Sequence, residues 1–188
     1  GSVSSLSSAL AGCFDDIESW NSCMGADLLV TVIASTNEPW AIDRGFLRPG
    51  RLGKAIFLGP LDAAGRSMFL RRQLLRQYQR VRDHYHQQHE DGAHYQEQEL
   101  KERLDEYVGV DQVVMHTEGF TGADLKLLLS TANQMLLLAQ SEVRPENGFW
   151  VGAVPQYDHF LSALQEVKPS VSSQEIAEYT DWLADQNK

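Results

Sequence analysis

A single apolar run places the strongest limit on the fold of this 188-residue chain. Residues 28–34 read Leu-Leu-Val-Thr-Val-Ile-Ala, a stretch rich in β-branched side chains. A strand of a parallel sheet is covered on both faces, so its sequence is continuously apolar and does not alternate. Residues 28–34 are therefore expected to form such a strand. Thr36 and Asn37 follow at its carboxyl end, which is where open α/β folds hold their ligands.

A turn with two arginines follows this strand. Residues 42–47 are expected to form a short helix, which the pair Pro49–Gly50 would stop. Arg48 and Arg51 flank that pair. A guanidinium stays protonated and binds phosphate oxygens through two parallel N–H groups. The turn is thus expected to present two fixed cations outward, ahead of a second, shorter strand at residues 54–58.

From residue 62 onward the apolar residues recur at helical spacing, and no further strand is expected. Residues 3–10 show the same spacing near the start of the chain. Capping boxes at Thr121–Asp124 and Ser172–Glu175 mark two helix starts, because a hydroxyl and an acid three residues later satisfy free amide groups. The expected helices in this part cover residues 65–80, 97–107, 110–116, 121–140, 156–167 and 172–185.

Composition excludes several classes of function. The chain has 26 acidic and 16 basic side chains, a formal net charge of −10, which opposes nonspecific attraction to nucleic acid or anionic lipid. No stretch approaches the ~20 consecutive apolar residues of a membrane span, and the N-terminus lacks the pattern of a signal peptide. We expect no nucleic-acid partner and no direct membrane insertion. Cys13 and Cys23 are expected to be reduced thiols.

Histidines gather in a polar stretch at residues 82–96 (His84, His86, His89 and His94). Together with neighbouring acids they supply enough ligands for zinc or another transition metal. The stretch contains no cysteine and no ordered ligand spacing, which favours a solvated insertion or an extended helix end instead. No metal site is expected in this chain.

Two motifs carry a family resemblance. Residues 32–39 (Val-Ile-Ala-Ser-Thr-Asn-Glu-Pro), then Ile-Asp at 42–43 and Phe-Leu-Arg-Pro-Gly-Arg-Leu at 46–52, resemble the second region of homology of classic AAA ATPases. Residues 118–125 (Glu-Gly-Phe-Thr-Gly-Ala-Asp-Leu) resemble the lid motif of the same family. The resemblance implies an α/β plus α-helical fold: the second half of a AAA+ nucleotide-binding core with parallel strands at residues 1–60, followed by a helical lid at residues 61–188.

The resemblance also implies roles for individual residues. Asn37 matches the first sensor, which polarises the attacking water. Arg48 and Arg51 match the paired arginine fingers that reach the γ-phosphate in the adjacent subunit of a hexamer. Gly122 and Ala123 match positions beside the adenine and ribose. The resemblance implies ATP and Mg²⁺ as cofactors, identical or related AAA subunits as partners, and ATP-driven remodelling of a protein substrate.

Three departures from the family pattern limit what this chain does alone. The phosphate loop, G-x-x-x-x-G-K-[ST], is absent from the 188 residues. Residues 14–18 (Phe-Asp-Asp-Ile-Glu) superficially resemble the metal-binding acid motif, but the strand of about five residues that should precede it is missing, so a helix at residues 3–11 is favoured. Gly53 replaces the acid usual after the finger turn. We expect the fragment not to hydrolyse ATP by itself.

The branch of the family is assigned by smaller features. Residues 169–172 and 175–179 resemble the C-terminal helix of several classic AAA proteins. Together with residues 56–59 and the lid motif at residues 121–125, they resemble the second ATPase domain of peroxisome-biogenesis AAA proteins most. That resemblance implies extraction of an import receptor, in the cytoplasm with peripheral attachment to the peroxisomal membrane. Pro39–Trp40 instead favours the microtubule-severing and endosomal-sorting branch. Valosin-containing-protein-like and ribosome-assembly relatives stay open, as does a AAA-like interaction module without hydrolysis.

Overall fold

The computed structural model describes residues 2–24, 28–86, 97–139, 142–146 and 149–186. These residues form two units, one of residues 1–58 with 174–188 and one of residues 59–173. The sequence places the boundary at residues 60–61 and leaves the last helix with the second part. In the structure this helix, α7 (Ser173–Gln186), groups with the first unit, through aromatic contacts described below.

The first unit begins with a long helix, α1 (Ser2–Cys23). It continues well beyond the helix expected from the spacing of residues 3–11, and it includes residues 14–18. The hypothesis of a metal-binding acid motif at residues 14–18 is therefore wrong, because that motif needs the end of a buried strand. A short 3₁₀ helix, η2 (Pro39–Ala41), replaces the helix expected at residues 42–47, where the chain instead makes a series of turns.

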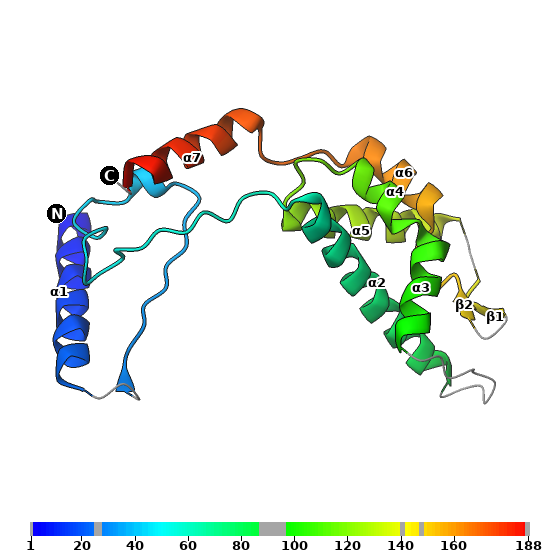
Figure 1. Ribbon diagram of the computed structural model, residues 1–188, viewed down its shortest axis with the longest axis horizontal. Helices are drawn as coiled ribbons and strands as arrows, with labels where there is room; N and C mark the ends of the chain where they lie inside the picture. The colour runs from blue at the N-terminus through cyan, green and yellow to red at the C-terminus, as the bar shows by residue number, and fades with distance from the viewer. Residues whose placement is uncertain (1, 25–27, 87–96, 140–141, 147–148, 187–188) are drawn as a thin grey trace. The chain divides into compact units, whose positions relative to one another are not determined.

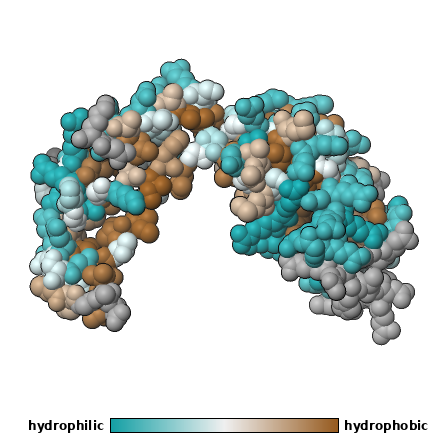
Figure 2. Space-filling model, in the orientation of Figure 1, coloured by the Kyte–Doolittle hydropathy of each residue, from teal (hydrophilic) through white to brown (hydrophobic). Residues whose placement is uncertain are grey.

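The segments expected to be parallel strands, residues 28–34 and 54–58, are unpaired, and this part of the prediction is corrected. Both run without regular backbone pairing, and their apolar side chains are exposed, Ile33 by 90% and Leu58 by 89%. Brown, hydrophobic atoms accordingly show on this unit in Figure 2. A strand requires a neighbour for its N–H and C=O groups, and within the described residues no strand lies beside them.

A side chain of α1 supplies part of that missing pairing. The side-chain Oδ1 of Asn21 accepts a hydrogen bond from the backbone N–H of Val30 at 2.8 Å, and its Nδ2 donates to the carbonyl of Val30 at 2.9 Å. The indole N–H of Trp20 donates to the carbonyl of Leu28 at 3.4 Å. The extended chain that leads to Asn37 is therefore held by α1 rather than by a sheet.

The second unit is helical, as the sequence predicts (Figure 1). Its helices are α2 (Ala63–His86), α3 (Glu97–Val108), α4 (Val110–Met115), α5 (Gly122–Leu138) and α6 (Tyr157–Glu166). They lie close to the predicted ranges, except that α2 is longer at both ends. α6 packs along α5, and Leu125 and Leu128 of α5 and Phe160 of α6 are fully buried in the same hydrophobic core. Phe160 thus belongs to the centre of the lid core.

A two-stranded hairpin in this unit was not expected from the sequence. Strand β1 (Arg144–Glu146) pairs antiparallel with β2 (Phe149–Val151). The hydroxyl of Tyr78 accepts a hydrogen bond from the backbone N–H of Trp150 at 3.0 Å, which ties the hairpin to α2. Asn147–Gly148 stands between the two strands in the sequence, and Asn-Gly is the strongest short-range hairpin signal. That signal would have found the hairpin.

Two further expectations concern metals and membranes. No group of three or more His, Cys, Asp or Glu side chains that would bind a metal occurs among the described residues. His89 and His94 of the expected polar insertion lie outside those residues. Among the helices described, none is both long and apolar enough to span a bilayer. Cys13 and Cys23 are free and exposed.

Candidate functional site

The arginine turn of the first unit is a well-defined loop. A carboxylate oxygen of Asp43 accepts the N–H of Gly45 at 2.7 Å, and the carbonyl of Phe46 accepts the N–H of Leu52 at 2.9 Å, which closes the loop. The N–H of Arg51 donates to the carbonyl of Arg48 at 3.1 Å.

Gly50, at the third position of the inner turn, has φ +86°, in the left-handed region that favours glycine. Proline second and glycine third are the residues of a type II turn. The Pro-Gly pair therefore fixes the two arginines at the two ends of one turn.

Arg51 is bound to its own chain. Its Nη2 lies 2.7 Å and 3.0 Å from the two carboxylate oxygens of Asp15 in α1, and its Nε lies 3.0 Å from one of them. Its Nη1 donates to the carbonyl of Gly45 at 3.1 Å. The side chain of Arg51 is 21% exposed and that of Asp15 is 59% exposed, so the pair adds roughly 0.2–1 kcal/mol to stability. Its main effect is to fix the geometry of the turn.

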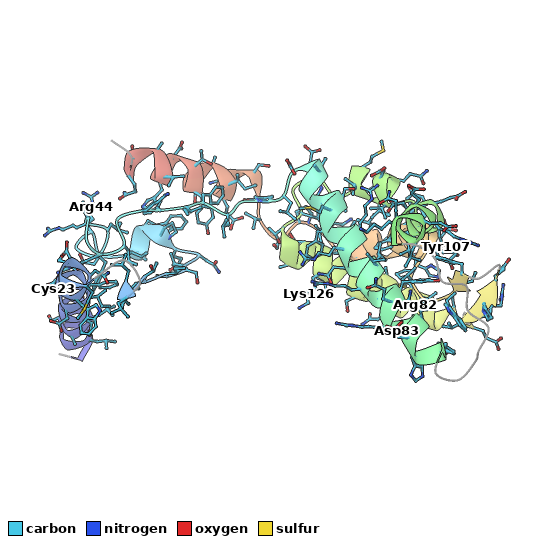
Figure 3. The ribbon with its side chains drawn as sticks, turned by 60° about the horizontal axis from the view of Figure 1, so that its bottom comes forward. Cys23, Arg44, Arg82, Asp83, Tyr107 and Lys126 are labelled. Carbon is cyan, nitrogen blue, oxygen red and sulfur yellow. The ribbon has the colours of Figure 1, made fainter. Side chains whose placement is uncertain are left out.

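Arg48 differs from Arg51 in this respect. Its side chain is exposed and forms no hydrogen bond or ion pair with another residue that the structure describes. The neighbouring Arg44 is also exposed and points away from the turn (Figure 3). The guanidinium of Arg48 can therefore bind a ligand on another molecule directly, whereas that of Arg51 would first have to break its ion pair with Asp15.

Asn37 lies at the end of the extended segment, two residues before η2. Its side-chain amide is exposed and forms no hydrogen bond within the described part of the chain. The hydroxyl of Thr36 accepts the N–H of Glu38 at 2.9 Å, and the carbonyl of Asn37 accepts a hydrogen bond from the hydroxyl of Tyr179 in α7. Backbone contacts therefore fix this residue while its amide stays available.

The sequence did not identify the residues of α1 that support the turn. Phe14 is buried, with its ring centroid 6.0 Å from that of Phe46. Asp15 binds Arg51, and the carboxylate of Glu18 lies beside Gly50. No acid follows the finger turn, where Gly53 stands, and Arg51 instead binds Asp15, which lies 36 residues before it. No local spacing signals such a contact, although the adjacent acids Asp15 and Asp16 stand ahead of the turn in the sequence.

The lid motif lies in the second unit, whereas Asn37 and the arginines lie in the first. Gly122 is the first residue of α5. A Cβ atom added to it would have no described atom within 4 Å, apart from its two chain neighbours and the backbone of its own helix. Ala123 is exposed. Glycine is thus required here neither by packing nor by backbone strain. The first turn of α5 presents a bare backbone at a helix N-terminus, where negative charge is favoured.

A capping box holds the start of α5. The hydroxyl of Thr121 accepts the N–H of Asp124 at 3.2 Å, while Oδ2 of Asp124 accepts the N–H and the hydroxyl of Thr121, both at 2.8 Å. The same oxygen accepts the N–H of Ser170 at 3.3 Å. Burial raises the pKa of Asp124, but these hydrogen bonds from Thr121 and Ser170 outweigh it, so the pKa lies below its ordinary value.

Asp124→Asn should lower the free energy of unfolding of the lid by about 1–2 kcal/mol at pH 7, because a neutral amide accepts these bonds less strongly. Hydrogen exchange of the amides of α5 measures the stability of the lid separately from that of the first unit. Asp158→Asn is the matched control, since Asp158 is exposed in the first turn of α6 and should cost only about 0.3–1 kcal/mol.

The same pair of variants predicts a pH dependence. A group whose pKa is lowered by folding contributes stability that is present above its unfolded pKa and is lost as pH falls through its folded pKa. The difference in the free energy of unfolding between the parent chain and Asp124→Asn should therefore shrink below about pH 4. A difference that stays constant down to pH 2 would show that the charge of Asp124 is not what stabilises the helix start.

The chain is similar to several known proteins. Residues 156–186, which include α6 and α7, match the Vps4 C terminal oligomerisation domain. The ATPase family gene 2 protein homolog B of Bos taurus is 33% identical over 150 residues, covering 80% of this chain and 15% of the relative. The nuclear valosin-containing protein-like protein of Mus musculus is 29% identical over 153 residues, covering 80% of this chain and 15% of the relative. The cell division cycle protein 48 homolog of Archaeoglobus fulgidus is 26% identical over 160 residues, covering 83% of this chain and 18% of the relative.

The chain is the C-terminal part of a AAA+ ATPase module. The fold class expected from the sequence is thereby confirmed, although the expected parallel strands are unpaired within the described residues. The AAA+ chain spans only 15–18% of the length of these three relatives. The roles of Asn37, Arg48, Arg51, Gly122 and Ala123 stay predictions.

Proposed function

We propose that the whole protein is an ATP-hydrolysing motor in which this chain supplies the sensor, the arginine finger and the lid. The observation that carries the proposal is the contrast within one turn. Arg51 is held by Asp15 of its own chain, whereas the exposed Arg48 has no partner among the described residues. A fixed turn with one available guanidinium suits a site completed across a subunit interface, because that guanidinium has no local ion pair to break on assembly.

Each predicted residue then has a distinct task. Asn37 orients the attacking water through its exposed amide. Arg48 stabilises the charge that develops on the γ-phosphate bound by the neighbouring subunit, while Arg51 holds the turn in place through Asp15. Gly122 and Ala123 let the backbone of α5 approach the adenine and ribose, as the empty space at the Cβ position of Gly122 permits.

Mg²⁺ is implied by the family, yet the described residues do not provide a site for it. No cluster of three or more carboxylate, histidine or cysteine ligands occurs among them. We therefore assign no step to Mg²⁺ on this chain. Its ligands in the proposed motor belong to ATP and to residues outside the described part of this chain.

The proposed assembly is a hexameric ring of identical or related AAA subunits that acts on a protein substrate. The match of residues 156–186 to an oligomerisation domain supports self-assembly. The net charge of −10 argues against nucleic acid as the substrate. Hydrolysis would move the lid as a rigid body and so transmit force to the ring.

We propose the valosin-containing-protein-like branch as the narrower assignment, because the name of one of the three relatives above, the nuclear valosin-containing protein-like protein, points to it. Extraction of a peroxisomal import receptor, in the cytoplasm and at the peroxisomal membrane, is a second proposal. It rests on the resemblance of residues 56–59, 121–125, 169–172 and 175–179. Rescue of receptor recycling in cells lacking the full-length protein would separate the two branches.

The rival of a different class is a AAA-like interaction module without hydrolysis. Turnover of ATP decides between them. The full-length protein should hydrolyse ATP in the presence of Mg²⁺ with kcat on the order of 1–10² s⁻¹, while the 188-residue chain shows no turnover above buffer, because it contains no phosphate loop. A full-length protein that binds a subunit partner but shows no turnover would favour the interaction module.

A further inference from the structure

The helix α7 contacts the segment that contains Asn37. Tyr179, near the middle of α7, lies between two aromatic side chains of the first unit. Its ring centroid is 5.4 Å from that of Phe57, with an angle of 19° between the planes, and 5.1 Å from that of Trp40, at 36°. Stacked aromatic pairs at such distances are worth about 0.5–1.5 kcal/mol beyond their buried area. We call Trp40, Phe57 and Tyr179 the aromatic clamp.

The hydroxyl at the tip of this clamp contacts the predicted sensor directly. The Tyr179 O–H donates a hydrogen bond to the backbone carbonyl of Asn37, across 142 residues of sequence. Trp40 belongs to η2, which starts two residues after Asn37. One tyrosine thus fixes the peptide group of Asn37 with its hydroxyl and the following turn with its ring.

We propose that Tyr179 is a positioning residue for Asn37, so that α7 sets the direction in which the Asn37 amide faces. The amide is exposed and has no partner of its own among the described residues, so its direction depends on the backbone that carries it. Misplacing a positioned group by about 1 Å is enough to cost on the order of 10² in rate. The inference rests on the proposed function of Asn37, and it gives α7 a task besides the oligomerisation that its family match suggests.

The test uses the full-length protein and three variants on α7. Tyr179→Phe removes only the hydrogen bond, and Tyr179→Ala removes the bond and the stacking. Thr180→Ala is the matched control, because Thr180 is the next residue, is exposed, and bonds only to the carbonyl of Ile176 within α7. The readouts are hydrogen exchange of the amides between residues 38 and 42, except Pro39, which has none, and the separate values of kcat and KM for ATP.

We expect faster exchange at residues 38–42 in both Tyr179 variants. kcat should fall about 3- to 10-fold for Tyr179→Phe and about 10- to 100-fold for Tyr179→Ala, with KM unchanged, because the amide acts on water and not on ATP binding. Thr180→Ala should match the parent. A loss confined to KM, or unchanged exchange in Tyr179→Ala, overturns the inference.

A double-mutant cycle separates positioning from a general loss of structure. If Tyr179 acts through the Asn37 amide, Tyr179→Phe should cause no further loss of kcat in a protein that already carries Asn37→Ala. An additive loss overturns the positioning role. If Asn37→Ala alone keeps the parental kcat, the proposed function of Asn37 fails and the positioning role falls with it, while the exchange data still show whether the clamp exists.

Discussion

Arg48→Ala should reduce ATP turnover of the full-length protein by on the order of 10³-fold or more, while ATP binding changes by less than about 3-fold. The reason is that the guanidinium of Arg48, exposed at the corner of the Pro-Gly turn, interacts with charge that appears only as the γ-phosphate bond breaks. Turnover is measured by phosphate release at saturating ATP. Binding is measured with a fluorescent nucleotide.

Arg44→Ala is the matched control for this experiment. Arg44 is an exposed arginine of the same loop, and it points away from the turn (Figure 3). Its loss removes the same charge and should leave turnover within about 2-fold of the parent, since distant exposed charges are screened by salt. Equal losses in the two variants would mean that net charge, and not the position of Arg48, governs turnover.

Phe160→Ala should lower the free energy of unfolding of the lid by about 3–5 kcal/mol. Phe160 of α6 is completely buried in the hydrophobic core of the lid, so truncation leaves a cavity that the surrounding helices fill only in part. Hydrogen exchange of the α5 amides measures this loss in the 188-residue chain without requiring the two units to unfold together.

Leu161→Ala controls for the shortening of a side chain in α6. Leu161 is the next residue and is 37% exposed, so its truncation should cost about 1 kcal/mol. If Phe160→Ala costs no more than Leu161→Ala, the packing of α6 along α5 is not the core of the lid.

The helices could be predicted because their information is local. Apolar spacing and the capping box at Thr121 place α5 to within a few residues, and the Pro-Gly pair predicts the turn that presents Arg48. These features depend on residues a few positions apart.

The unpaired strands and the supporting contacts could not be predicted in the same way. A strand needs neighbours, and the apolar run at residues 28–34 signals burial without saying whether the described chain supplies it. Asp15 and Tyr179 lie 36 and 142 residues from the groups they bind, so no spacing rule connects them. The residues that hold the candidate site together were therefore the ones the sequence did not reveal.

The central claim is that Arg48 completes the site of a neighbouring subunit, and mixing two inactive variants tests it directly. Asn37→Ala removes the sensor and keeps the finger, whereas Arg48→Ala keeps the sensor and removes the finger. In rings formed from an equal mixture, about a quarter of the sites should combine an intact Asn37 with an Arg48 from the next subunit. We predict that turnover recovers to about a quarter of the parental value. No recovery, in rings shown to contain both variants, would contradict action across the subunit interface.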